Sequence, residues 1–180
     1  MTESFPAIRF ATPADLTPLH ALVERAYRGD SARRGWTHEA DLIGGQRTDV
    51  AALRAIVDAP DQRILVAIDG GAIVGCVHIA RAAGEGAYLG LLCVDPSRQA
   101  AGLGSGLVAA AEREAATGLG ARRIEMTVIR QRGELVAYYQ RRGYALTGEE
   151  RPFPLDDPRF GLPKTRELAF VVLAKAIGPA

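Results

Sequence analysis

The chain has 180 residues and a mass of 19.2 kDa, a length typical of a single domain, which we expect to span residues 1–180. Its 48% hydrophobic and 24% charged residues exclude a disordered chain or a disulfide scaffold. A net charge of +1 gives no whole-chain field that would attract nucleic acid or an anionic membrane. Two separated cysteines in apolar stretches, and no apolar run long enough to span a membrane, predict a cytoplasmic protein.

The first half of the chain predicts a short strand, two helices and an antiparallel hairpin. Thr12-Pro13-Ala14-Asp15 is typical of a helix start, and apolar residues continue from it at helical spacing to Tyr27. A second helix is predicted to begin near Thr48 or Asp49, with Val50, Leu53 and Val57 facing inward. Strands are predicted at 7–10, 64–68 and 72–79, the last two joined by a tight glycine turn, and the aperiodic stretch 29–47 is predicted to be a functional loop.

The second half alternates strands with helices. The predicted strands are 88–94, 123–129, 144–149 and 167–173, and the predicted helices are 104–117 and 133–142, each closed by glycine. Residues 151–163 are rich in proline and charge and are predicted to be a loop that serves as a lid or substrate wall.

A glycine-rich turn between the strand at 88–94 and the next helix carries the strongest chemical signal. Small residues there let backbone N–H groups approach an anion, and the helix N-terminus favours negative charge, which suits a pyrophosphate. Position 107 is Leu where the dinucleotide fingerprint has its third glycine, and no G-K-[ST] follows, so NAD and ATP are disfavoured. Glycines that only form a turn and pack a helix remain the alternative.

The pattern Gln99-x-x-Gly102-x-Gly104, preceded by Val94-Asp95-Pro96, resembles the acyl-CoA signature of the GNAT (Gcn5-related N-acetyltransferase) superfamily. The resemblance extends over about residues 8–174. It implies an α/β fold of one domain, with a mixed, largely antiparallel central sheet flanked by helices. It also implies transfer of an acetyl group from acetyl-CoA to a primary amine of a small molecule or peptide, by direct attack in a ternary complex and with no metal.

The resemblance also implies roles for particular residues. The segment Ala137–Tyr144 is similar to the end of a family helix whose tyrosine protonates the departing thiolate, and Tyr139 takes that place. Backbone groups of the 88–94 strand would hold the pantetheine, and the turn would hold the pyrophosphate. The cofactor-binding residues so implied are Leu92, Cys93, Val94, Gln99, Ala100, Ala101, Gly102, Leu103, Gly104 and Ser105.

The general base and the acceptor site carry weaker signals. Glu125 alternates with apolar neighbours and could point into the cleft as the base, acting through water, although a salt-bridged glutamate fits the same pattern. Trp36 and Glu39 could stack on and pair with an amine, although a tryptophan that fastens a loop is the alternative. The arginines at 130, 132, 141 and 142 suit an acidic substrate or the coenzyme's 3′-phosphate, but such clusters are usually solvated faces.

A second class of function stays open from the sequence. The same fold could hold acyl-CoA as a sensor, or bind a partner, without turnover, because fold alone does not establish activity. The sequence does not identify the acceptor amine, the acyl chain or the oligomeric state, with a homodimer among the options.

Overall fold

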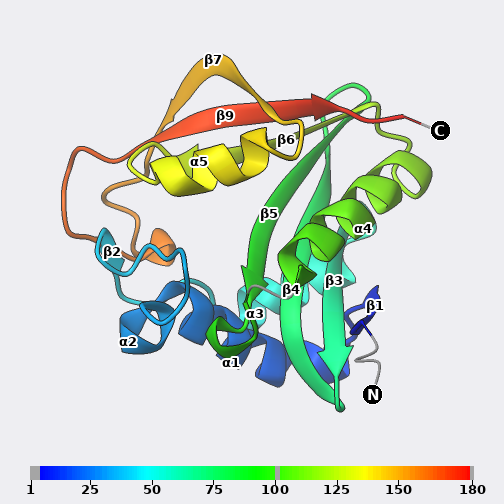
Figure 1. Cartoon of the computed structure of the whole chain (residues 1–180), viewed down its shortest axis with the longest axis horizontal. Helices are drawn as coiled ribbons and strands as arrows, with labels where there is room; N and C mark the ends of the chain where they lie inside the picture. The colour runs from blue at the N-terminus through cyan, green and yellow to red at the C-terminus, as the bar shows by residue number, and fades with distance from the viewer. Residues whose placement is uncertain (1–4, 100–101, 179–180) are drawn as a thin grey trace.

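The computed structural model describes residues 5–99 and 102–178, and Ala100 and Ala101 lie outside the described residues. A seven-stranded sheet with the order β1-β3-β4-β5-β6-β9-β7 forms the centre of the fold (Figure 1). The β5–β6 pair is parallel, whereas every other neighbouring pair of this sheet is antiparallel. The strands are β1 (Ala7–Phe10), β3 (Gln62–Asp69), β4 (Ala72–Ala82), β5 (Gly86–Val94), β6 (Arg123–Ile129), β7 (Ala145–Pro152) and β9 (Ala169–Ala176).

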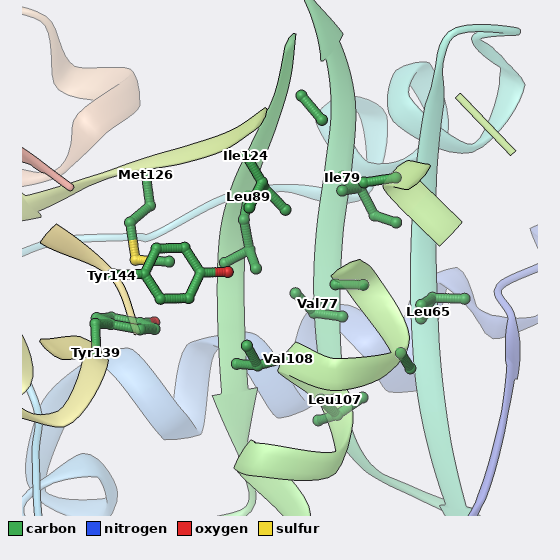
Figure 2. Packing of buried hydrophobic residues seen from close by; sticks show 14 of the residues in the cluster. Leu65, Val77, Ile79, Leu89, Leu107, Val108, Ile124, Met126, Tyr139 and Tyr144 are labelled. Atoms are coloured by element: carbon green, nitrogen blue, oxygen red, sulfur yellow. The ribbon is translucent and has the colours of Figure 1, made fainter. Parts of the chain in front are cut away.

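Helices cover both faces of this sheet. The α-helices are α1 (Leu16–Tyr27), α2 (Gly29–Ala32), α3 (Val50–Asp58), α4 (Leu103–Thr117) and α5 (Gly133–Gln140). One buried cluster joins the sheet to α4 and α5, and a second joins the opposite face to α1 and α3. Figure 2 shows the first cluster, with Leu107 and Val108 of α4 over the β3 and β4 side chains and the rings of Tyr139 and Tyr144 beside Met126. The expected mixed, largely antiparallel α/β fold is confirmed.

The start of α1 illustrates how local chemistry sets an element boundary. A short 3-10 turn, η1 (Pro13–Asp15), precedes α1, and the Asp15 carboxylate accepts a hydrogen bond from the Thr12 backbone N–H at 2.8 Å. Arg9 on β1 donates two bonds to the same carboxylate at 2.7 and 2.9 Å. Hydrogen bonding by Arg9 holds the pKa of Asp15 well below its usual range, so the charged cap fastens the first strand to the first helix.

The neighbouring strands β5 and β6 separate part-way along their length. They pair only over Gly86–Tyr88 and Arg123–Glu125, so the remainder of β5 has no partner on β6. On its other side β5 shifts register against β4 between Gly90 and Cys93, and Leu91 has a positive φ of 51°. A β-bulge of this kind places an extra residue in one strand and turns its side chains. The carboxyl half of β5 therefore borders an opening in the sheet, which Figure 1 shows as the divergence of β6 and β9 from β5.

Two details differ from the sequence-based expectations. Val50 is exposed at the first position of α3, because Asp49 caps the helix there and only Leu53 reaches full burial. The two predicted loops also contain short elements that pair with each other, β2 (Ile43–Gly44) with β8 (Leu162–Pro163), while η3 (Pro158–Phe160) lies just before β8. This pairing joins the loop that follows α2 to the one that follows β7. Among the described residues, no helix is long and apolar enough to cross a membrane.

Candidate active site

A cavity of about 930 Å³ lies where β5 parts from β6. Its walls come from the bulged half of β5, the start of α4, one face of α5 and the loop after α2. Sequence-predicted residues that line it are Trp36, Glu39, Leu92, Cys93, Val94, Gln99, Gly102, Leu103, Gly104, Ser105 and Tyr139. Segments far apart in the chain thus meet around one space large enough for an extended ligand.

The turn after β5 is built to expose backbone at one end of this cavity. A second 3-10 turn, η2 (Pro96–Arg98), is capped by the Asp95 carboxylate, which accepts from the Ser97 backbone N–H at 3.0 Å. Gly102 then adopts a left-handed conformation with φ of 75° and begins α4. A Cβ on Gly104 would lie 2.9 Å from the Tyr138 hydroxyl, so a side chain there would fill the space. The first residues of the 15-residue α4 line this space, and the N–H groups of a first helical turn have no acceptor within the helix, which suits an anion.

Tyr139 lies on α5 and is almost fully buried, yet it lines the cavity. Its ring packs edge-on against Tyr138 and Tyr144, with centroid separations of 5.3 and 5.8 Å. No hydrogen-bond partner for its hydroxyl is found among residues 5–99 and 102–178. Burial raises the pKa of Tyr139 above its ordinary value, so the phenol keeps its proton at physiological pH. A protonated hydroxyl without a protein acceptor can donate to a ligand.

Glu125 is not among the residues that line the cavity, and of the two arrangements that the sequence left open the salt-bridged one is found. Its carboxylate accepts from Arg151 on β7 at 3.0 Å and from Arg123 at 3.1 Å. The alternation along β6 correctly predicted that Glu125 lies on the other face of the strand from Ile124 and Met126. The sheet continues beyond β6 with β9 and β7, and Arg151 on β7 reaches the Glu125 carboxylate. Glu125 is therefore held in an ion-paired cluster and is not among the residues that line the cavity.

Trp36 is half-exposed and lines the cavity close to Gln99. Its ring centroid lies 5.2 Å from that of Tyr138, and its backbone N–H donates to the Gln99 side chain at 2.8 Å. The guanidinium of Arg142 covers the Tyr138 ring at 3.4 Å and donates to the Ser105 hydroxyl at 2.5 Å. The first loop is thereby joined to the turn at 99–105. The acceptor role of Trp36 stays a prediction.

Glu39 is buried and surrounded by arginines. One carboxylate oxygen pairs with Arg28 and lies 3.7 Å from the Arg47 Nε, and the other lies 3.5 Å from the Arg132 Nη1. Both carboxylate oxygens already face cations, so the expected direct pairing of Glu39 with an acceptor amine is not the arrangement found. The four arginines for which the sequence left a ligand-binding role or a solvated face open are divided between the two: Arg132 and Arg142 line the cavity, whereas Arg130 and Arg141 are exposed.

The two cysteines lie opposite each other on β4 and β5. Their sulfur atoms are 3.5 Å apart, and Cys76 also donates to the Leu91 carbonyl. The hydrogen bond with Cys93 and, as a second cause, burial raise the pKa of Cys76 well above the ordinary value for a thiol. A thiol held protonated in this way is a poor nucleophile.

Comparison with known protein families agrees with this geometry. The family model described as an acetyltransferase (GNAT) domain matches residues 40–153, more than half of the chain. The chain belongs to the GNAT acetyltransferase family. None of the curated proteins compared with this GNAT chain matches it.

Solved structures share the fold of this GNAT acetyltransferase at low sequence identity. A GNAT-family acetyltransferase from Streptococcus pneumoniae is 23% identical, with a TM-score of 0.69, covering 95% of this chain and 99% of that one. The Salmonella typhimurium protein yncA, solved with its cofactor acetyl-CoA, is 18% identical, with a TM-score of 0.71 and coverage of 98% and 96%. A phosphinothricin acetyltransferase from Sinorhizobium meliloti, in complex with acetyl-CoA, is 18% identical, with a TM-score of 0.69 and coverage of 97% and 90%.

Tyr27 and Arg47 are among the cavity residues that sequence reasoning missed. Tyr27 donates from its hydroxyl to the Leu92 carbonyl at 2.6 Å, which fastens the bulge to α1, and the Arg47 guanidinium lies 5.0 Å from the Tyr27 ring centroid. The helical spacing of Tyr27 could have indicated that it faces inward. Arg47 lies in an aperiodic stretch, so no sequence pattern indicated its position. Within the described residues, no group of three or more histidine, cysteine or acidic side chains could hold a metal ion.

Proposed function

We propose that this GNAT acetyltransferase transfers an acetyl group from acetyl-CoA to a primary amine of a small molecule or peptide, by direct attack in a ternary complex. The observation that carries the proposal is the single cavity shared by the β5 bulge, the opening turn of α4 and the hydroxyl of Tyr139. Solved structures with this fold contain acetyl-CoA, which supports the same ligand here.

The backbone would hold the coenzyme. The N–H groups at the start of α4 and the side chains of Ser105 and Arg142 suit the pyrophosphate. Leu91 and Leu92 have no register partner on β4 or β6, so their backbone N–H groups suit the extended pantetheine arm and the thioester oxygen. Gln99, Gly102, Leu103 and Gly104 line the same end of the cavity.

The transfer needs a base, an oxyanion donor and an acid. The acceptor nitrogen forms its bond to the acetyl carbon, the carbon–sulfur bond breaks, and the Tyr139 hydroxyl gives its proton to the departing thiolate and then regains one from solvent. Because burial keeps Tyr139 protonated, its phenol is available as this acid. The amine loses its proton to water in the cavity, since Glu125 is held elsewhere by two arginines.

Calorimetric titration of the full chain with acetyl-CoA tests the proposal, with NAD and ATP as controls. We expect saturable binding of acetyl-CoA with a Kd on the order of micromolar, and no binding of either control. Release of free coenzyme A thiol with a panel of amines then separates an enzyme from a protein that only binds acyl-CoA. The absence of acetyl-CoA binding would refute the proposal, and binding without turnover of any amine would favour the sensor.

A further inference from the structure

The part of the cavity wall around Glu39 contains an excess of buried positive charge. Arg28, Glu39 and Arg132 are each less than a tenth exposed, and Arg47 partly faces the cavity. Among the described residues that line the cavity, Glu39 is the one acidic side chain, against five arginines. Three of the five, Arg34, Arg98 and Arg142, lie away from Glu39, and Arg142 donates a hydrogen bond to Ser105 of the α4 turn. Arg47 and Arg132 are the two grouped around Glu39.

The protein itself leaves this cluster incompletely paired. Arg132 donates to the Thr37 hydroxyl at 2.7 Å, but its Nε has no hydrogen-bond partner, the half-exposed Glu134 lying 3.8 Å away. The buried Nε of Arg28 also has no partner. Three guanidinium groups thus face two carboxylates, one buried and one half-exposed, which leaves one positive charge unmatched. Burying an unpaired charge is unfavourable, so the arrangement is typical of a site that receives an anion.

The cluster lies next to the reacting groups. Arg132 is the residue immediately before α5, the helix that carries Tyr139, and its charge acts on the Tyr139 phenol. Arg47 lies over Tyr27, whose hydroxyl holds the Leu92 carbonyl at the bulge. An anion bound between Arg47 and Arg132 would therefore sit beside the place where an acceptor amine must meet the thioester.

We propose that the acceptor of this enzyme is an amino carboxylate, and that Arg47 and Arg132 bind its carboxylate while Glu39 positions the two guanidinium groups. A planar, singly charged carboxylate matches both the single unmatched positive charge and the fork geometry of arginine. Arg28 pairs with Glu39 but does not line the cavity, so it also is a positioning residue, which holds Glu39 in place. The inference rests on the proposed acetyl transfer and specifies its substrate class.

A comparison of matched acceptors tests the substrate class directly. The full chain is assayed for coenzyme A release with common L-amino acids, their amides and the corresponding decarboxylated amines. We expect kcat/KM for the best acid to exceed that of its amide and amine by about tenfold or more, because each analogue leaves a guanidinium unpaired. Equal or faster turnover of the amides or amines would overturn the inference.

If the enzyme acetylates none of these acceptors, a binding measurement tests whether the cavity prefers amino carboxylates to their amides. The thermal unfolding midpoint is measured with a pool of L-amino acids and, separately, with a pool of their amides, at equal ionic strength. We expect only the acid pool to raise the midpoint, because a ligand that binds the native state stabilises it. No difference between the two pools would overturn the inference.

Variants identify the residues and separate this inference from coenzyme binding. Arg132→Gln and Arg47→Gln are expected to raise KM for the acid by about tenfold or more, with the acetyl-CoA Kd unchanged within about twofold. Arg132→Lys should restore part of the loss, and Arg130→Gln, an exposed neighbour outside the cavity paired with Glu150, should change neither value. If Arg132→Gln fails to fold, Arg47→Gln carries the test.

A loss of acetyl-CoA affinity in both Gln variants, with KM for the acid unchanged, would assign the arginines to the coenzyme phosphates and overturn the inference. Failure of the wild-type chain to bind acetyl-CoA would instead refute the proposed transfer itself. The two failures are therefore distinguishable.

Discussion

At the scale of single residues, the adjacent tyrosines of α5 have different surroundings. Tyr138 packs against both Trp36 and Arg142, and its hydroxyl reaches the α4 turn near Gly104. Tyr139 lies deeper, and its hydroxyl has no acceptor within the described part of the chain. One tyrosine is thus engaged in packing and the other is available for chemistry.

Replacement of Tyr139 tests its role as the acid. We expect Tyr139→Phe to lower kcat by roughly ten- to a thousandfold, because the thiolate would lose a positioned proton donor, with the acetyl-CoA Kd unchanged within about twofold. Steady-state release of coenzyme A thiol and calorimetric titration measure the two quantities.

Tyr144→Phe is the matched control, because Tyr144 packs against the same ring but bonds Glu112 at 2.9 Å and lies outside the cavity. We expect it to leave kcat nearly unchanged and to lower stability by about 1 kcal/mol. Equal kcat values for Tyr139→Phe and wild type would make Tyr139 a packing residue.

At the scale of elements, the bulge in β5 has the largest consequence. The pattern of alternate burial continues without a break at Ala87, Leu89, Leu91 and Cys93. Ala87 and Leu89 nevertheless belong to the cluster under α4, and Leu91 and Cys93 belong to the cluster under α1. The extra residue at the bulge rotates the strand, so that one run of alternating residues serves both faces.

The opening turn of α4 yields a second prediction. We expect Gly104→Ala to weaken acetyl-CoA binding by about three- to tenfold, because the new Cβ would displace the Tyr138 hydroxyl at 2.9 Å and disturb the ring held by Trp36 and Arg142. Calorimetric titration measures the change in Kd.

Gly106→Ala, on the same helix, is its control. The Cβ there would meet only the end of the exposed Phe5 side chain, so acetyl-CoA affinity should stay the same while helix propensity raises stability by about 0.5–1 kcal/mol. Equal weakening of binding in both variants would show that the effect is not specific to Tyr138.

At the scale of the whole molecule, a histidine on the central sheet makes stability depend on pH. His78 on β4 bonds the Gln62 side chain on β3 at 2.8 Å. Burial, together with the charge of Arg47, lowers the pKa of His78 to about 4. In the unfolded chain a histidine has a pKa of about 6.5, so between these values the unfolded state binds more protons.

The free energy of unfolding is therefore expected to fall as the pH drops from about 7 to about 4, and the contribution of His78 to level off below that. The loss attributable to this residue should be about 3 kcal/mol, from a pKa difference of about 2.5 units. Denaturant unfolding of wild type and His78→Gln at both pH values measures it, since glutamine can keep the bond to Gln62 without titrating. An identical pH dependence in the two proteins would contradict this assignment.

The structure of the two long loops, the one after α2 and the one after β7, depends on contacts between distant parts of the chain. The pairing of Ile43 with Pro163 and of Gly44 with Leu162 brings together segments separated by more than a hundred residues. Within the stretch 151–163, predicted to be a lid or substrate wall, Phe153 packs in a core cluster with Ile43 and Ile129, whereas Phe160 lines the cavity. Proline and charge content predicted a loop correctly but carried no information about which residues face the ligand.

The sequence alone determined the order of the main strands and helices, because periodicity and capping act between near neighbours in the chain. The α/β class and the acyl-CoA signature at Gln99, Gly102 and Gly104 were implied by the resemblance to a known family. Only the tertiary structure decided that Glu125 is held by Arg151 and that Glu39 gathers three arginines. Those pairings join residues far apart in sequence, and electrostatic partners are chosen by proximity in space, which no local pattern specifies.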